Sequence, residues 1–283
     1  MFGNLPIIAG CNQNGAYECA ITLFMQMQDQ EQKPDRHTLS SILSVSAGLA
    51  ALVLGRQIHQ LITKTVIGDL PVKNSLVTMY SRCGAIIEAR AIFDEMGRHK
   101  DVITWNAMIG GYASHGNGST ALKLFEAMKM ERVQPAYITF ISVLNACSHA
   151  GLQDEGRKYF ASMISDFGIE PRTEHYAALV DIAGRHGQLK EALDFIRSMP
   201  HKPDKAMWGA LLAACKIHKN IKLARVAADA LAGLEPDSSA SYVLLHNTLT
   251  ELDQWEYAKE VRKSMEGNAI KKERASSWVE RSA

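Results

Sequence analysis

Apolar side chains recur with helical spacing along most of the chain. In one stretch they follow the i, i+3, i+4, i+7 spacing of a single helix face: Ala121, Leu124, Phe125 and Met128. An apolar run of helix length, 105–114, precedes this stretch and ends in the turn-forming sequence His-Gly-Asn-Gly at 115–118. The pattern predicts a helical hairpin whose second helix buries one apolar face.

The hairpin pattern repeats along the chain. A shift of 101 residues superposes identical residues: Gly10 on Gly111, Phe24 on Phe125 and Pro34 on Pro135. A shift of 32 residues superposes Asn74 on Asn106, so the long period contains units of about 32–36 residues. A hairpin of this length cannot bury its apolar face alone, so neighbouring units have to stack. The sequence therefore predicts an all-α solenoid of stacked helix-turn-helix repeats.

Small residues occupy one position of the second helix in several units: Ala20, Ala89, Ala121, Ala192 and Ala224. At such a position only a small side chain lets neighbouring helices approach closely. The Met and Phe residues that recur on the same helices are predicted to pack in the core rather than to bind a ligand.

Composition is that of an ordinary folded chain. The 283 residues include 31 Lys and Arg against 30 Asp and Glu, which gives a net charge of +1, and 47% are hydrophobic. This apolar content suffices for a sizeable core and makes wholesale disorder improbable. No apolar run reaches about 18 residues, so no membrane span is expected. A near-neutral chain does not indicate a nonspecific grip on polyphosphate, which needs an excess of Lys and Arg.

Five cysteines are widely spaced and form no C-x-x-C motif: Cys11, Cys19, Cys83, Cys147 and Cys215. Their odd number and spacing argue against a disulfide framework and against a zinc site. We therefore expect free thiols and neither a metal nor another cofactor. A Gly-x-x-x-x-Gly-Lys phosphate loop and an arrangement for nucleophilic catalysis are also missing, so we do not expect an enzyme.

Residues 102–135 resemble a pentatricopeptide repeat nearly position by position: V-I-T-W-N-A-M-I-G-G-Y-A-S-H-G-N-G-S-T-A-L-K-L-F-E-A-M-K-M-E-R-V-Q-P. Units of three lengths follow in an order that resembles the plant-type P-L-S arrangement: 1–35, 36–69, 70–101, 102–136, 137–172 and 173–204. The last two units, 205–238 and 239–280, resemble the paired E motifs of such proteins through Trp208–Leu212, Tyr242–Leu245 and Ser276–Glu280. Residues 281–283 form a tail.

This resemblance implies a right-handed superhelical solenoid that binds single-stranded RNA, one base per repeat. In the family the fifth and last residues of each unit read the base, which gives these candidate pairs: Leu5 with Asp35, Ser40 with Asp69, Asn74 with Asp101, Asn106 with Ala136, Ile141 with Arg172, and Ala177 with Asp204. Apolar residues at position 2, such as Ile103 and Ile138, would sandwich the base.

The candidate pairs differ in their chemistry. An amide offers both hydrogen-bond donors and acceptors, while a carboxylate offers acceptors alone. Asn74 and Asp101 together therefore present a defined pattern of donors and acceptors to a base, and they match the family's uridine-preferring pair. Asn106 favours a pyrimidine, but Ala136 removes the second polar group and should weaken discrimination. The apolar fifth residues Leu5, Ile141 and Ala177 cannot hydrogen-bond to a base. Each aspartate at a unit end could instead cap the following helix.

The E-like units imply a role as the site-recognition factor in organellar C-to-U RNA editing. Cytidine deamination needs the zinc signature H-x-E with C-x-x-C, which this chain lacks, so a DYW-type deaminase would have to act in trans. In the family, L-type units, here 36–69 and 137–172, also bind small accessory editing factors. The family's geometry places a uridine read by Asn74 and Asp101 at position minus seven from the edited cytidine.

The resemblance places the protein in a mitochondrion or a chloroplast. The first thirty residues contain no Lys or Arg, so no targeting segment is expected in this chain. The small number of repeats suggests a shortened member of the family or a fragment. Two other functions stay open. One is organellar RNA processing, stability or translation, and the other is a protein-binding scaffold like that of tetratricopeptide repeats.

Overall fold

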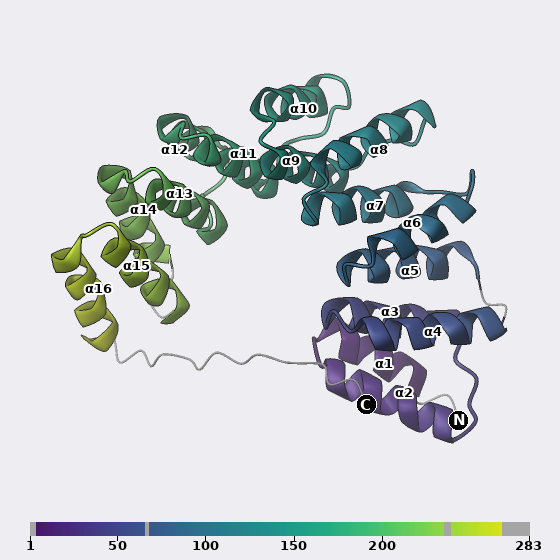
Figure 1. Cartoon of the computed structure of the whole chain (residues 1–283). Coiled ribbons are helices and arrows are strands. Elements are labelled where there is room, and N and C mark those ends of the chain that lie inside the picture. Colours follow the sequence, from purple (N-terminus) through teal and green to yellow (C-terminus); the bar gives the residue numbers. More distant parts are fainter. Residues whose placement is uncertain (1–3, 66–67, 235–238, 268–283) are drawn as a thin grey trace. The chain divides into compact units, whose positions relative to one another are not determined.

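The computed structural model describes residues 4–65, 68–234 and 239–267, which form sixteen α-helices and no strand (Figure 1). In chain order the helices are α1 (Asn4–Gln13), α2 (Tyr17–Asp29), α3 (Arg36–Gly48), α4 (Leu52–Thr65), α5 (Leu70–Arg82), α6 (Ile86–Glu95), α7 (Val102–Ser114), α8 (Gly118–Met130), α9 (Tyr137–Ala150), α10 (Gln153–Ser165), α11 (Thr173–Arg185), α12 (Leu189–Ser198), α13 (Lys205–Ile217), α14 (Ile221–Leu234), α15 (Ser239–Glu251) and α16 (Trp255–Gly267). The predicted all-α fold is confirmed.

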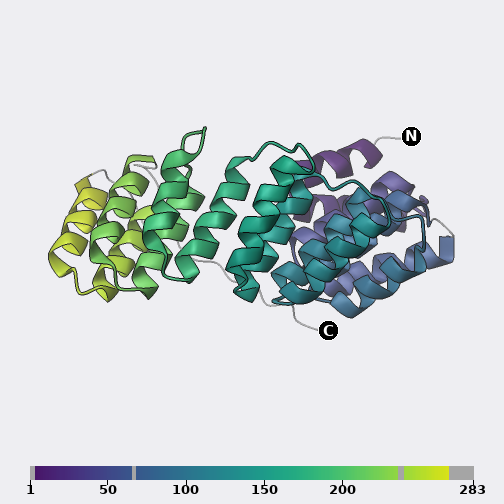
Figure 2. The same ribbon diagram turned by 90° about the horizontal axis from the view of Figure 1, so that it is seen from above.

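The helices belong to two compact units, 1–146 and 147–283, whose boundary falls within α9. In the first unit the odd-numbered helices α1, α3, α5 and α7 pack against one another in a row. The helices α2, α4 and α6 each pack against their hairpin partner and the next odd-numbered helix, and α8 packs against its hairpin partner α7. In the second unit α11, α13 and α15 form the corresponding row. Within each unit, successive helices lie side by side, as Figure 2 shows. We name the odd-numbered helices inner helices and the even-numbered ones outer helices.

The predicted core positions are buried. The Met and Phe side chains that recur at equivalent positions on the outer helices, or directly after them, are almost fully enclosed: Phe24, Met27, Phe93, Met96, Phe125 and Met128. The small residues predicted to allow close packing have no exposed surface: Ala20, Ala89, Ala121, Ala192 and Ala224. Burial of these apolar side chains is the main free-energy term that holds each hairpin against the next. Among the described residues, no helix is both long and apolar enough to span a bilayer.

Four inner helices begin at an aspartate. The carboxylates of Asp35, Asp69, Asp101 and Asp204 accept a hydrogen bond from the backbone N–H three residues further on, at the first turns of α3, α5, α7 and α13. A carboxylate in this place satisfies a backbone donor that has no partner within the helix. The capping role that the sequence allowed for these aspartates is therefore confirmed.

Candidate functional site

The structure brings Asn74 and Asp101 together. Asn74 lies on α5 and is 6% exposed, while Asp101 precedes α7, the inner helix of the next hairpin. The amide Nδ2 of Asn74 donates to both carboxylate oxygens of Asp101, at 3.0 Å to Oδ1 and 3.1 Å to Oδ2. The fifth residue of one unit and its last residue thus form one hydrogen-bonded pair at the junction of two hairpins.

A third residue, Thr104, completes this group. Its hydroxyl lies 2.5 Å from Oδ1 of Asn74 and 2.9 Å from Oδ1 of Asp101, and its backbone N–H donates to the same carboxylate oxygen at 2.9 Å. The backbone N–H of Asp101 donates in return to the hydroxyl oxygen of Thr104 at 3.2 Å. The amide, the carboxylate and the helix start therefore hold one another in a single network.

A cavity of about 330 Å³ opens beside this network. Asn74 and Asp101 line it together with Pro71, Ile103 and Arg82. Ile103 stands at position 2 of its unit with 57% of its surface exposed, and Pro71 holds the same position in the preceding unit. Arg82 is exposed and lies two helical turns beyond Asn74 on α5.

The next unit repeats this arrangement with one change. A cavity of about 550 Å³ is lined by Asn106, Ile103 and Ile138, and the exposed fraction of Ile138 is 45%. The hydroxyl of Thr139 donates to Oδ1 of Asn106 at 2.6 Å, as Thr104 does to Asn74. Ala136 has no polar side-chain group, and its backbone N–H donates to the hydroxyl oxygen of Thr139 at 2.9 Å. Ile103 lines both cavities and therefore separates the two candidate base sites.

The pair Ser40 with Asp69 is not joined in the described part of the chain. The carboxylate of Asp69 accepts hydrogen bonds from Arg36, at 3.3 Å, and from the backbone of Val72. Ser40 lies half-buried on α3.

For the pair Leu5 with Asp35, the structure describes the side chain of Asp35, and the side chain of Leu5 lies outside the described part of the chain. Asp35 accepts from both the backbone N–H and the hydroxyl of Thr38, at 2.8 Å each. Burial works to raise the pKa of Asp35, but these hydrogen bonds, with the nearby His37, lower it below its ordinary value.

The two remaining pairs lack a polar fifth residue. Ile141 is half-buried in α9, in the first compact unit, and Arg172 is exposed at the start of α11, in the second. Ala177 is half-buried on α11, and Asp204 caps α13 through the backbone N–H of Met207 at 3.1 Å. Neither fifth residue offers a hydrogen bond to a base.

Four residues at these sites were not among the sequence candidates: Pro71 and Arg82, which line a cavity, and Thr104 and Thr139, whose hydroxyls bond to the two asparagines. A signal for the threonines is present in the sequence, because Thr104 and Thr139 each stand three residues after the last position of a unit. Their partners, Asn74 and Asn106, lie on the preceding hairpin, so these contacts depend on how the hairpins pack.

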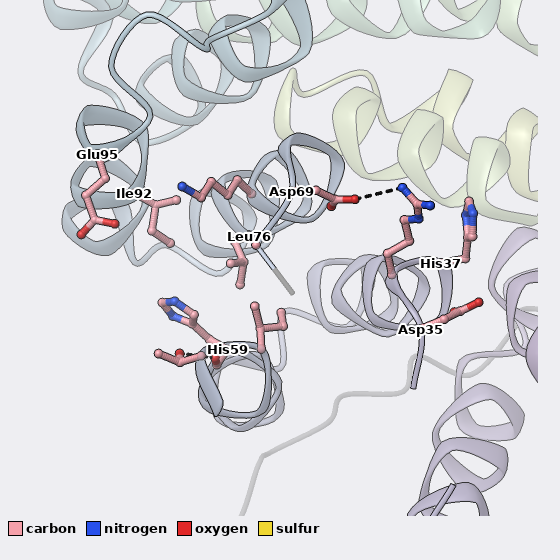
Figure 3. A pocket seen from close by; sticks show the side chains of 12 residues that line it. Asp35, His37, His59, Asp69, Leu76, Ile92 and Glu95 are labelled. Carbon is pink, nitrogen blue, oxygen red and sulfur yellow. Dashed lines mark hydrogen bonds and ion pairs between the residues drawn. The ribbon is translucent and has the colours of Figure 1, made fainter. Parts of the chain in front are cut away.

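A larger cavity, of about 880 Å³, lies on the other face of α5, between the ends of hairpins α3–α4 and α5–α6 (Figure 3). Its lining includes His59 on α4, Leu76 on α5, and Ile92 and Glu95 on α6. Asp69 also lines it and faces Arg36. No cluster of three or more His, Cys, Asp or Glu side chains that could hold a metal ion occurs among the described residues.

Comparison with known proteins identifies the family of this chain. Models described as PPR repeat match residues 7–31, 72–100 and 174–202, a model described as PPR repeat family matches 100–149, and one described as E motif matches 218–280. A mitochondrial pentatricopeptide repeat-containing protein of Arabidopsis thaliana is 56% identical over 270 residues, and the chloroplastic pentatricopeptide repeat-containing protein DOT4 of the same plant is 40% identical over 276 residues. The chain belongs to the pentatricopeptide repeat proteins.

The similarity covers nearly all of this chain but a minor part of each relative. The two alignments cover 95% and 97% of the chain, and 41% and 32% of the respective relatives. Among solved structures, the pentatricopeptide repeat protein PPR10 from maize superposes with a TM-score of 0.62 at 20% identity, over 95% of this chain and 39% of that protein. This likeness shows the shared solenoid fold. The P-L-S order of the units stays a prediction, and the sequence at Ser276–Glu280 lies outside the described residues.

Proposed function

We propose that this chain binds single-stranded RNA sequence-selectively, one base per repeat, and that Asn74 and Asp101 form its best-defined reading pair. The observation that carries the proposal is the paired amide and carboxylate at the edge of a cavity that also contains Pro71 and Ile103. The maize protein PPR10 has also been solved in complex with an 18-nt psaJ RNA element.

The hydrogen-bonding capacity of this pair favours uridine. One Nδ2 proton of Asn74, shared between the two oxygens of Asp101, accounts for both contacts and leaves the second proton to donate to a base carbonyl. Oδ1 of Asp101 already accepts from Thr104, whereas Oδ2 accepts only from Asn74 in the described network and can take a base N–H. Uracil presents carbonyl acceptors beside an N3–H donor, which complements one donor and one acceptor.

The surroundings of the pair suit a nucleotide. Pro71 and Ile103 provide apolar surfaces against which a base can stack, as a sequence-tolerant source of affinity. Arg82 is exposed at the same cavity, where its guanidinium can pair with a phosphate of the backbone. Such local contacts do not require a strongly basic chain.

For the biological role we propose site recognition in organellar C-to-U RNA editing, with a DYW-type deaminase recruited in trans rather than catalysis by this chain. The match of the E motif model to 218–280 supports this role, and relatives named mitochondrial or chloroplastic support an organellar location. Accessory editing factors would dock on 36–69 and 137–172. The large cavity in Figure 3, lined mainly by residues of 36–69 and the following unit, offers such a factor a recessed surface.

Binding of the chain to short RNAs tests the reading role. The RNAs differ only in the base opposite 70–101, and duplex RNA and single-stranded DNA serve as controls. We expect a preference for uridine that is lost in duplex and that disappears in Asn74→Ala and Asp101→Ala. Unchanged preference in both variants would refute the assignment of this pair.

An editing assay then separates the two RNA roles. With a DYW-type deaminase and accessory factors added, we expect conversion of the cytidine seven nucleotides after the uridine read by Asn74 and Asp101. RNA binding without conversion would favour processing, stability or translation of transcripts instead. Loss of a peptide ligand in groove variants, without any base preference, would favour a protein-binding scaffold.

A further inference from the structure

Thr104 and Thr139 occupy the same place at the start of two inner helices. Each is the third residue of its helix, α7 or α9, and each side chain is fully buried. Each hydroxyl reaches back to the previous hairpin and meets the side-chain oxygen of an asparagine at position 5: Thr104 meets Asn74 at 2.5 Å and Thr139 meets Asn106 at 2.6 Å. The contact therefore recurs in the two units with an asparagine at this position.

The hydrogen bonds of Thr139 determine which end of the Asn106 amide it holds. The Thr139 oxygen accepts from the backbone N–H of Ala136, so its single proton needs an acceptor. Oδ1 of Asn106 is the acceptor that the described residues provide. A half-turn of the amide would bring Nδ2 against the hydroxyl and leave a buried donor unsatisfied. Thr139 thus keeps Oδ1 inward, and both Nδ2 protons remain available at the cavity.

At Asn74 a second group enforces the same orientation. The carboxylate of Asp101 accepts hydrogen bonds but cannot donate them, so it selects the Nδ2 end of the amide without help from Thr104. Ala136 has no such group, which leaves Thr139 alone in this role. Thr38 provides the contrast, because the residue at position 5 of the preceding unit is the apolar Leu5. The hydroxyl of Thr38 donates instead to Asp35, which caps the helix that contains Thr38, at 2.8 Å.

From this geometry we infer that Thr139, and to a smaller extent Thr104, is a positioning residue for base selection that need not touch the RNA. The inference rests on the proposed RNA-binding function. With its orientation fixed, Asn106 shows a base two donors and no acceptor, since Ala136 adds none. Cytosine has acceptors at N3 and O2 of its pairing edge, whereas uracil has a donor at N3, so this unit favours cytidine over uridine.

The test uses three variants of the full chain. Thr139→Val keeps the shape and removes the hydroxyl, Thr139→Ser keeps the hydroxyl, and Thr22→Val removes a hydroxyl that bonds to Glu18 of its own outer helix, α2. Affinity is measured for RNAs that carry cytidine or uridine opposite 102–136. We expect the cytidine-to-uridine ratio to fall by about 3- to 10-fold in Thr139→Val, the size of one lost hydrogen bond, and to stay near wild type in the other two.

A second measurement reports the contact without RNA. A double-mutant cycle pairs Thr139→Val with Asn106→Ala in urea unfolding, and the two changes should be non-additive, whereas Thr139→Ser should restore the coupling. The same curves show whether each variant is folded.

The outcomes separate the inference from the proposed function. If wild type discriminates cytidine from uridine and Thr139→Val does so equally, the inference is wrong while RNA reading stands. Additive changes in the cycle, or a wild type that binds RNA without distinguishing these bases, also overturn it. If wild type binds none of the RNAs, the proposed function fails and the role of Thr139 in base selection fails with it.

Discussion

Asn74 donates its amide to both oxygens of Asp101, so the fifth residue of one repeat is tied to the first turn of the next inner helix. Asp101 both caps a helix and belongs to the candidate reading pair. Its Oδ1 caps α7 through the backbone of Thr104, and the pair as a whole lies at a cavity. Helix capping and base reading are therefore compatible in one carboxylate.

Replacing Asp101 should cost stability as well as base preference. Asp101→Ala removes the cap of α7 and leaves the amide of Asn74 without its acceptor, so we expect a loss of about 1–2 kcal/mol in the free energy of unfolding. Asn220→Ala is the matched control, because Asn220 caps the outer helix α14 through the backbone N–H of Leu223. Urea unfolding should show a similar loss in both variants. Base preference opposite 70–101 should change in Asp101→Ala alone, and a parallel change in the control would contradict the assignment.

Ile103 should contribute to RNA affinity while contributing little to folding. More than half of its surface is exposed, and it lines both candidate base cavities. We expect Ile103→Ala to weaken binding by about 1 kcal/mol, roughly fivefold, because two bases lose a stacking surface. Ile87, 81% exposed on the outer helix α6, provides the control substitution Ile87→Ala. Titration of both variants with the same RNA decides the point, and equal affinities would exclude stacking on Ile103.

Two adjacent glycines of α7 should respond differently to alanine. A Cβ at Gly111 would lie 2.7 Å from Oγ and 2.8 Å from Cβ of Ser81, whereas a Cβ at Gly110 would meet only Oγ of Ser142, at 3.3 Å. Gly111→Ala should therefore push α7 from α5 and destabilise the fold by about 1–3 kcal/mol. Gly110→Ala should be near neutral or slightly stabilising, since alanine is the better helix former. Thermal or urea unfolding of the two variants measures the difference, and similar stabilities would show that the hairpins can shift apart without cost.

His59 should make the stability of the first unit depend on pH. Burial lowers the pKa of His59 below its ordinary value, against an opposing attraction from Glu95, and Nδ1 lies 2.9 Å from the hydroxyl of Tyr80. Below about pH 6.5 the unfolded chain binds a proton at this residue more readily than the folded chain does, so the free energy of unfolding falls as the pH falls. Urea unfolding between pH 5 and 7.5 should show a weaker dependence in His59→Gln. Identical slopes would mean that this histidine does not contribute.

Much of the fold could be predicted from the sequence, because each hairpin depends on local spacing. Phe125 and Met128 share a helix face whatever surrounds them, and both are buried as expected. The pairing of Asn74 with Asp101 followed from the family pattern. The role of Thr139 could not be foreseen, since its hydroxyl acts on Asn106, 33 residues earlier, through the stacking of two hairpins. Threonine recurs at the third position of several units, but this periodicity does not show which side chain the hydroxyl contacts.

The cysteines also form a side-chain contact that could not be predicted from the sequence, and this contact leads to a redox prediction. The sequence indicated free thiols but did not show that the sulfurs of Cys11 on α1 and Cys19 on α2 lie 3.2 Å apart. Burial raises the pKa of Cys147 to about 12 and that of Cys215 to about 11, so these two thiols should be unreactive near neutral pH. The three other cysteines are less buried, and among them Cys11 and Cys19 have sulfurs close enough to form a disulfide.

Oxidised glutathione should link Cys11 to Cys19. One thiolate attacks the glutathione disulfide and releases one glutathione thiol, and the second cysteine then displaces the other glutathione to form the protein disulfide. Only a small rotation of the side chains is needed, because the sulfurs are already close. Peptide mapping under non-reducing conditions should find this link in wild type, and Cys19→Ser should instead retain glutathione on Cys11. Recovery of Cys11 and Cys19 as separate glutathione adducts in wild type would show that the two helices hold the sulfurs too far apart in solution.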